Sequence, residues 1–292
     1  MNLHLAVALF LTLLAVAVTP SASDESVRVD GITWLSGDPP PSDKGSKADS
    51  KQLVPSIVAF MQAQWPEVRH TIVHADALRA WQLIASGEHV CQPSSVCTPE
   101  RERLAYFTNS LLGPPQQLIV RRDKLAALPR NAAGEVDLAR LLADERLRGG
   151  IVDGRSYGSF IDTLLAQRPA NKAITLYAVS DFGSKIMALL GMDRADYAIG
   201  YDVALSQDRE SNPLLTQLLS QAIAGASEPV LAGVACPRTA WGLAAIQGID
   251  KVLGTLAGAA MLRQVAARWL TPETRQHYGV RLDAFYKERA GP

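Results

Sequence analysis

The residues best suited to chemistry lie in the stretch CTPERERLAYFTNS, at positions 97–110. Arg101 and Arg103 alternate there with two glutamates. A guanidinium offers parallel N–H donors that match a carboxylate, so one of these arginines would suit an anionic ligand. The same residues would equally suit a solvated helical turn that begins with Thr98 as its N-cap. The stretch by itself leaves both interpretations open.

Other kinds of reactive site find little support in the sequence. The chain has five histidines, of which His70 and His74 lie four apart in a run that alternates like a strand. In a strand these two residues would be about 13 Å apart, too far to share a metal ion. No CxxC, HExxH, P-loop or GxGxxG pattern occurs. We therefore expect neither a metal nor a cofactor.

The charge balance of the chain also bears on which classes of binding partner to expect. Lysines and arginines number 29, and aspartates and glutamates also number 29, which gives a formal net charge of zero. Zero net charge gives no electrostatic reason to expect a nucleic acid or an anionic membrane surface as partner. We expect a monomer whose partner is a small molecule.

The N-terminus has the pattern of an export signal. An apolar run at 5–18 is followed by SAS at 21–23 and then by charged residues. The run is shorter than the roughly 20 apolar residues that span a bilayer, which favours a removed signal over a retained anchor. We expect cleavage near Ser23 and a periplasmic protein of 269 residues, since 292 − 23 = 269.

Three cysteines are present, Cys91, Cys97 and Cys236. In an oxidising compartment two of them could pair, and Cys91 with Cys97 would close a small loop around QPSSV. Three buried thiols are the alternative, because spacing alone does not fix the geometry of a disulfide.

Hydrophobic periodicity predicts an alternation of strands and helices in two series. In the first series we expect strands at 27–35, 68–75 and 89–91 and helices at 50–64 and 76–87, the second capped by Asp76. In the second series we expect strands at 116–122, 149–154, 173–179, 195–202 and 229–236 and helices at 136–147, 156–168, 180–192 and 212–225. The remainder reads as helices at 241–256, 259–269, 272–278 and 281–289.

This order predicts an α/β protein of two lobes joined by a two-strand hinge. We expect lobe 1 at 24–115, lobe 2 at 116–237, and a helical segment at 238–292 that packs back on lobe 1. The crossovers fall near 113–117 and 234–240. Ligands of such sheets bind at the carboxyl ends of the strands, here in the cleft between the lobes.

An ordered set of motifs resembles the family 3 extracellular solute-binding proteins of ABC importers, and more narrowly a poorly characterised proteobacterial branch. The family's motif has a Thr, an Arg three residues on, and an aromatic and a Ser/Thr six and seven residues past the Arg. Thr98, Arg101, Phe107 and Thr108 stand in that register. ITWLSGDPPP, WQLIASG, PPQQLIVRR, DYAIGY and AWGLAAIQGID complete the set over nearly the whole mature chain.

The resemblance implies a hinged clamp of the type II periplasmic-binding-protein-like fold. By position in the motif, Arg101 would pair with a ligand carboxylate and Thr98 would add a hydroxyl. In the second lobe Arg155 and Ser156 match the family's helix start, whose free N–H groups face the same anion. Trp34, before GDPPP, would stack on the ligand. Trp81 lies on an amphipathic helix, and we expect it in the core.

The chain also departs from the amino-acid binders of that family. Their ammonium-binding Asp lies five residues past the first Asp of a strand, and counting from Asp196 gives Tyr201. The G-x-x-x-G-x-x-x-D segment is replaced by GSKADSKQLVPS. Asp38 and Tyr201 remain candidates to face the cleft. We expect a small anionic or polar solute rather than a plain α-amino acid.

Two other functions fit the same scaffold. One is a dehydratase-like enzyme acting on cyclic acids, which would need a general acid such as Asp38 or Asp202. The other is a periplasmic partner-binding protein whose cleft no longer binds a solute. For the leading hypothesis, an ABC permease or a sensor would be the partner that receives the bound form.

Overall fold

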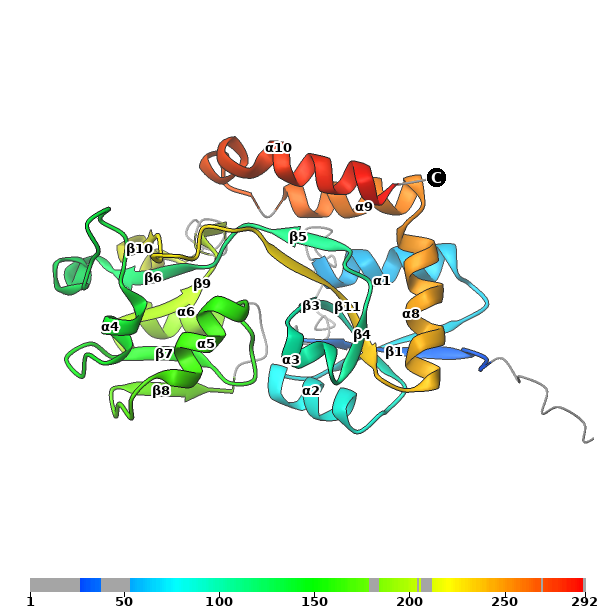
Figure 1. Cartoon of the computed structure of the whole chain (residues 1–292), viewed down its shortest axis with the longest axis horizontal. Helices are drawn as coiled ribbons and strands as arrows, with labels where there is room; N and C mark the ends of the chain where they lie inside the picture. The colour runs from blue at the N-terminus through cyan, green and yellow to red at the C-terminus, as the bar shows by residue number, and fades with distance from the viewer. Residues whose placement is uncertain are drawn as a thin grey trace, which may run out of the picture.

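The computed structural model describes residues 27–37, 53–178, 184–203, 205, 212–268 and 270–290. Within them the chain forms two β-sheets, which Figure 1 shows as two lobes side by side, each with its own helices. The predicted two-lobed α/β fold is confirmed. The predicted export signal and Asp38 lie outside the described residues.

Lobe 1 is built on a mixed sheet of six strands. They are β2 (Arg69–His74), β1 (Gly31–Ser36), β3 (Val90–Val96), β11 (Val230–Pro237), β4 (Ala105–Phe107) and β5 (Leu111–Gly113). The first three pair in parallel, while β11 runs antiparallel to β3, β4 and β5. Strand β11 is the point at which the chain, returning from lobe 2, completes the sheet of lobe 1.

Helices cover both faces of this sheet. They are α1 (Leu53–Gln64), α2 (Ala77–Ala85), α3 (Pro99–Glu102), α8 (Ala240–Leu253), α9 (Leu256–Ala267) and α10 (Pro272–Arg289). Their starts follow the expected chemistry, since the carboxylate of Asp76 accepts the N–H of Arg79 at 2.8 Å and Thr239 caps α8 in the same way. Apolar residues of α1, α8 and α9 pack with Trp34 into one continuous core.

Lobe 2 has a sheet of five strands that is buried on both faces. The order is β10 (Leu218–Gln221), β6 (Gln117–Arg121), β9 (Tyr197–Gly200), β7 (Gly149–Val152) and β8 (Ile174–Tyr177). One face packs on α4 (Leu138–Leu142) and α5 (Ser159–Gln167), and the other on α6 (Ser184–Gly191) and the 3-10 helix η2 (Pro213–Gln217). A second 3-10 helix, η1 (Arg122–Ala127), follows β6.

One predicted helix of lobe 2 is wrong. Residues 212–225 form the short helix η2 and then strand β10, which pairs antiparallel with β6. Asn212 caps the 3-10 turn and Pro213 opens it, and the backbone then leaves the helix to complete the edge of the sheet. The pairing with β6 therefore overrides the helical periodicity of the apolar residues.

The second crossover also lies earlier than expected. The first runs from β5 into β6, close to the predicted 113–117. The return crossover lies at 222–229, between β10 and β11, and not at 234–240. The expected end of lobe 2 at residue 237 is therefore too late, because the whole of β11 pairs within the sheet of lobe 1.

The C-terminal helix runs beside both crossovers, along the top of the molecule in Figure 1. The predicted break between residues 278 and 281 is absent, and α10 continues through Gly279. At its start Thr271 and Thr274 donate to Asp202 of lobe 2 at 3.1 and 2.9 Å. Near its end the hydroxyl of Tyr286 accepts the N–H of Leu112 at 3.2 Å. Helix α10 thus contacts both lobes.

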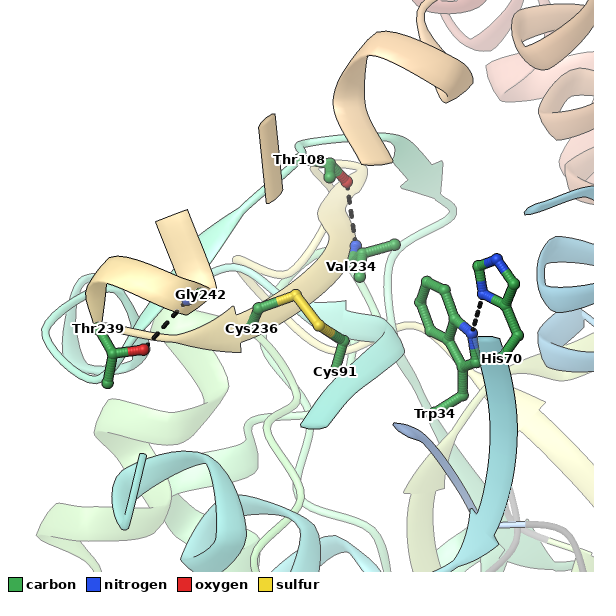
Figure 2. Close-up of a disulfide and its surroundings, with 8 residues drawn as sticks. All are labelled: Trp34, His70, Cys91, Thr108, Val234, Cys236, Thr239 and Gly242. Carbon is green, nitrogen blue, oxygen red and sulfur yellow. Dashed lines mark hydrogen bonds between the residues drawn. A yellow bond between two sulfur atoms is a disulfide. The ribbon is translucent and has the colours of Figure 1, made fainter. Parts of the chain in front are cut away.

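A disulfide joins Cys91 to Cys236, across the neighbouring strands β3 and β11 (Figure 2). The candidate pairing of Cys91 with Cys97 and the alternative of three unpaired thiols are both wrong, and Cys97 is a free thiol. Cys91 is the second residue of the extended strand β3 and Cys97 follows its last residue, so they are about 20 Å apart, far beyond the reach of a disulfide. The thiol of Cys97 donates to Glu102, and burial together with that bond raises its pKa to about 12.

Two features are absent from the described ranges. None of their helices has the length and apolar character needed to cross a membrane. No group of three or more potential metal ligands occurs among these residues either.

Candidate functional site

A cavity of about 160 Å³ lies between the two lobes. Lobe 1 contributes the end of β3 and the starts of α2 and α3, lobe 2 contributes the loop between β7 and α5, and the crossovers close the cavity at the hinge. The walls are largely apolar. The polar and aromatic side chains on them are Trp81, Gln92, Ser94, Ser95, Arg101, Gln116, Arg155, Ser156, Tyr201 and Tyr286.

Arg101 is the central charged group of this cavity. Its guanidinium lies 4.3 Å from the centroid of the Trp81 ring, a cation–π distance. The guanidinium donates to the hydroxyl of Ser95 and the carbonyl of Val96, both at 3.3 Å, and to the carbonyl of Gly154 at 3.0 Å. A guanidinium has five N–H donors, so two have no acceptor among the described residues.

Burial lowers the pKa of Arg101 to about 10, and the nearby Arg155 acts in the same direction, whereas Asp162 opposes it. The side chain still carries its charge at neutral pH. An anion placed in the cavity would restore part of the solvation that this cation has lost.

The remaining motif residues hold Arg101 in place. Thr98 caps α3 and accepts the N–H of Arg101 at 3.3 Å, so the predicted cap is confirmed, but Thr98 does not line the cavity. Phe107 stacks on Trp81 with ring centroids 6.4 Å apart. Thr108 ties β4 to β11 by accepting the N–H of Val234 at 3.1 Å (Figure 2). The motif is therefore a support for one guanidinium.

The two arginines of the stretch have separate environments. Arg103 points to solvent and lies 3.8 Å from Glu100, with both side chains about 70% exposed. Exposed pairs of this kind contribute little to stability or specificity. Arg101 is the one that faces the cavity, in agreement with the motif register.

The two tryptophans have exchanged their expected places. Trp34, which the sequence places on the ligand, is fully buried in the core of lobe 1, where its Nε1 donates to His70 at 3.0 Å (Figure 2). Trp81, expected in the core, lines the cavity. Trp34 lies on β1 with its side chain on the α1 and α8 face of the sheet, away from the cleft.

The loop after β7 supplies the predicted residues of lobe 2, but with different chemistry. Arg155 and Ser156 line the cavity, as does Tyr201 at the end of β9. The hydroxyl of Ser156 donates to Asp162 at 2.5 Å, and Asp162 also accepts the N–H of Tyr157 at 2.8 Å. Helix α5 starts at Ser159 rather than at Ser156, so these donors already serve a carboxylate of the protein.

Residues 154–158 also have the G-x-S-x-G spacing that places a nucleophilic serine between a strand and a helix in hydrolases. A nucleophilic serine needs an adjacent general base, most often an imidazole. Ser156 donates instead to Asp162, and no histidine of the described chain lines the cavity. The two glycines of this pattern therefore shape the loop between β7 and α5, and Ser156 is not a nucleophile here.

Tyr201, which the motif resemblance puts in place of an ammonium-binding Asp, lies near the cation Arg155. The guanidinium of Arg155 lies 6.0 Å from the Tyr201 ring and 5.3 Å from the Tyr157 ring. Burial raises the pKa of Tyr201, so its hydroxyl remains neutral. Asp202 does not line the cavity, because its carboxylate accepts from Thr271 and Thr274.

Gln116 is a site residue that the sequence reasoning missed. It lies on the first crossover, is 2% exposed, and lines the cavity. Neither its Nε2 nor its Oε1 has a hydrogen-bond partner among the described residues, and the same is true of Trp81 Nε1. The available signal was a pair of polar residues, QQ, within the apolar crossover.

The lobes touch directly at Gly154. Its φ is +70°, and a Cβ added there would lie 2.7 Å from the backbone of Leu78 on α2 of lobe 1. Together with the bond from Arg101 to the carbonyl of Gly154, this contact shows the lobes closed upon each other beside the cavity.

Replacing Gly154 by alanine is expected to hold the lobes apart. The positive φ costs about 1 kcal/mol, but the larger effect is the clash with Leu78, which only a separation of the lobes relieves. Small-angle scattering should report a larger radius of gyration than for the unchanged protein. Gly134→Ala is the matched control, since Gly134 has φ +82° and open space around its Cβ position. Equal radii for the two variants would contradict the proposed contact.

No protein-family model matches the chain, and no curated protein sequence does. Solved structures do. A histidine kinase sensor domain with similarity to periplasmic binding proteins aligns at TM-score 0.55 and 19% identity, over 84% of this chain and 97% of that one. The chain has the fold of a two-lobed periplasmic binding protein.

Two further binding proteins show the same likeness. A mutant of ArgBP from T. maritima aligns at TM-score 0.59 and 14% identity, covering 82% of this chain and 95% of that one. The substrate-binding protein AbpA of an amino acid ABC transporter from Streptococcus pneumoniae, bound to L-arginine, aligns at 0.56 and 14%, covering 83% and 97%. At these identities the likeness concerns the fold.

Proposed function

We propose that the protein binds a small carboxylate-bearing solute between its lobes and delivers the bound form to an ABC permease or a sensor. The observation that carries this proposal is Arg101, a charged guanidinium in the cavity between the lobes, with two N–H donors that no described residue satisfies. A carboxylate is the planar partner that such donors fit.

The fold supplies the means of capture. Arg101 and Trp81 belong to lobe 1, whereas Arg155 and Tyr201 belong to lobe 2. A solute that contacts both sets stabilises the closed arrangement more than the open one, and this difference drives closure. Sensor domains and transport proteins both occur among the structures of the same fold, so the proposal covers both uses. We place the mature protein in the periplasm as a monomer.

An enzyme on this scaffold would need an acid or nucleophile in the cavity. Asp202 and Ser156, the described candidates, are engaged with other residues. No carboxylate lines the cavity within the described ranges. We therefore favour binding over turnover.

A thermal-shift screen of small carboxylates, followed by titration calorimetry, tests this function. A ligand at 100 times its Kd stabilises the folded state by about 2.7 kcal/mol, which raises Tm by several degrees in a chain of this size. We expect at least one carboxylate to do so and the matching neutral amide to fail. If a broad library of carboxylates left Tm unchanged, the cleft would be one that no longer binds a solute.

A further inference from the structure

Two residues that line the cavity carry three buried polar atoms that lack partners among the described residues. Two belong to the amide of Gln116 and the third is the indole Nε1 of Trp81. A buried polar atom left unpaired costs about 1–3 kcal/mol, so native proteins rarely keep three together without a ligand or water to satisfy them. The hydrogen-bonding needs of these three atoms therefore indicate which polar groups a bound ligand should carry.

Each atom specifies what it needs. The Nε1–H of Trp81 only donates, so it requires an acceptor. The amide of Gln116 both donates and accepts, so it requires a group that does the same. A hydroxyl is such a group. A keto oxygen only accepts and an ammonium only donates, and each would leave one end of the amide unpaired.

The charged side chains around the cavity also disfavour a ligand with an ammonium group. Arg101 and Arg155 are the only charged side chains on its walls within the described ranges, and both are cations. No described carboxylate of the walls is present to pair with an ammonium group. An α-amino acid would therefore bring its ammonium near the guanidinium of Arg101, with no carboxylate of the described walls to pair with it, and such burial is costly.

The size of the cavity limits the rest of the solute. Its volume of about 160 Å³ is close to that of an engineered protein cavity that holds benzene. The walls beyond the polar groups include Leu35, Val54 and Val230. A short branched or linear aliphatic body fits this space.

We propose that the ligand is a small hydroxy acid, and that Gln116 is the residue that hydrogen-bonds to its hydroxyl. This inference rests on the proposed function, in which Arg101 holds the carboxylate. Gln116 lies on the first crossover, between β5 of lobe 1 and β6 of lobe 2. The hydroxyl would exchange bonds with both ends of the amide.

Four acids that share one carbon skeleton and differ only in the group at C2 test which group the site prefers. They are 2-hydroxy-3-methylbutanoate as both enantiomers, 2-oxo-3-methylbutanoate, 3-methylbutanoate and valine. By calorimetry on the purified protein we expect the preferred hydroxy acid to bind 10- to 100-fold more tightly than 3-methylbutanoate, and valine to bind most weakly. Each tenfold step corresponds to about 1.4 kcal/mol, the scale of one or two neutral hydrogen bonds.

Variants of the crossover then test the residue. Gln116→Leu should bring the hydroxy acid to within about threefold of 3-methylbutanoate, while Gln116→Glu should favour valine, because it places a carboxylate beside the ammonium. Gln117→Leu is the matched control and should keep the order of the unchanged protein, since Gln117 lines a separate surface pocket.

Equal binding of all four acids, or a hydroxyl preference that survives Gln116→Leu, would overturn this inference and leave the proposed function intact. Failure of all four acids to bind, while another carboxylate binds, would also overturn it. Failure of every carboxylate in the wider screen is a different result, which overturns the proposed function itself.

Discussion

Replacing Arg101 by alanine is expected to lower the affinity for a carboxylate ligand by about 10- to 150-fold, which corresponds to the 1.5–3 kcal/mol of a charge-assisted hydrogen bond. Arg101 combines a charge, a plane that stacks on Trp81, and two N–H donors without an acceptor among the described residues. Its stacking on Trp81 and its bonds to Ser95 and Val96 hold that plane before the ligand arrives. Calorimetry with a carboxylate from the screen measures the loss.

Two matched variants make this result specific. Arg103→Ala removes an arginine two positions away whose side chain is exposed, and it should leave affinity unchanged. Arg101→Lys keeps the charge but loses the planar pair of donors and the stacking, so we expect at least a tenfold loss. Full affinity in Arg101→Lys would mean that charge alone, and not the fork of donors, holds the anion.

Loss of the disulfide should produce the largest change in stability. Cys91 and Cys236 are separated by 145 residues, a loop that contains the whole of lobe 2. In the chain-entropy account, closing a loop of this length destabilises the unfolded state by about 5 kcal/mol. The double variant Cys91→Ala, Cys236→Ala should therefore lose about 2–5 kcal/mol in urea unfolding.

The free cysteine provides the control for that measurement. Cys97→Ala removes a thiol just after strand β3 without opening the loop and should change stability by less than about 1 kcal/mol. A reducing agent should lower the stability of the unchanged protein to that of the double variant. Unfolding curves that coincide for the double variant and the unchanged protein would exclude a stabilising disulfide.

The sequence was sufficient wherever a local rule determined the structure. The caps at Asp76 and Thr98 follow from side-chain oxygens that satisfy the first N–H groups of a helix. The alternation of apolar residues located both sheets. The register from Thr98 to Phe107 separated Arg101 from Arg103, because only one arginine could share the motif's position.

The features that could not be predicted from the sequence depend on contacts between residues far apart in the chain. The partner of Cys91 depends on β11 returning to lie beside β3, which is 145 residues away in the chain. Strand β10 exists because β6 offers it an edge to pair with, whereas its own residues are compatible with a helix. Periodicity reports the face of an element, but not what lies against that face.

The positions of the aromatic and polar residues of the site could not be predicted from the sequence for the same reason. Trp34 and Trp81 have similar apolar neighbours in sequence, and only the packing of α1 and α8 places the first in the core and the second at the cleft. Gln116 became a candidate because its amide is buried and lacks a partner among the described residues, a property that no sequence pattern records.

Native mass spectrometry of freshly purified protein tests the central account most directly. We predict a bound small acid that leaves on denaturation, is retained by Arg103→Ala, and is absent from Arg101→Ala when both variants are prepared in the same way. A solute retained in full by Arg101→Ala would contradict the account, because the cavity would then hold its ligand without the guanidinium assigned to the carboxylate.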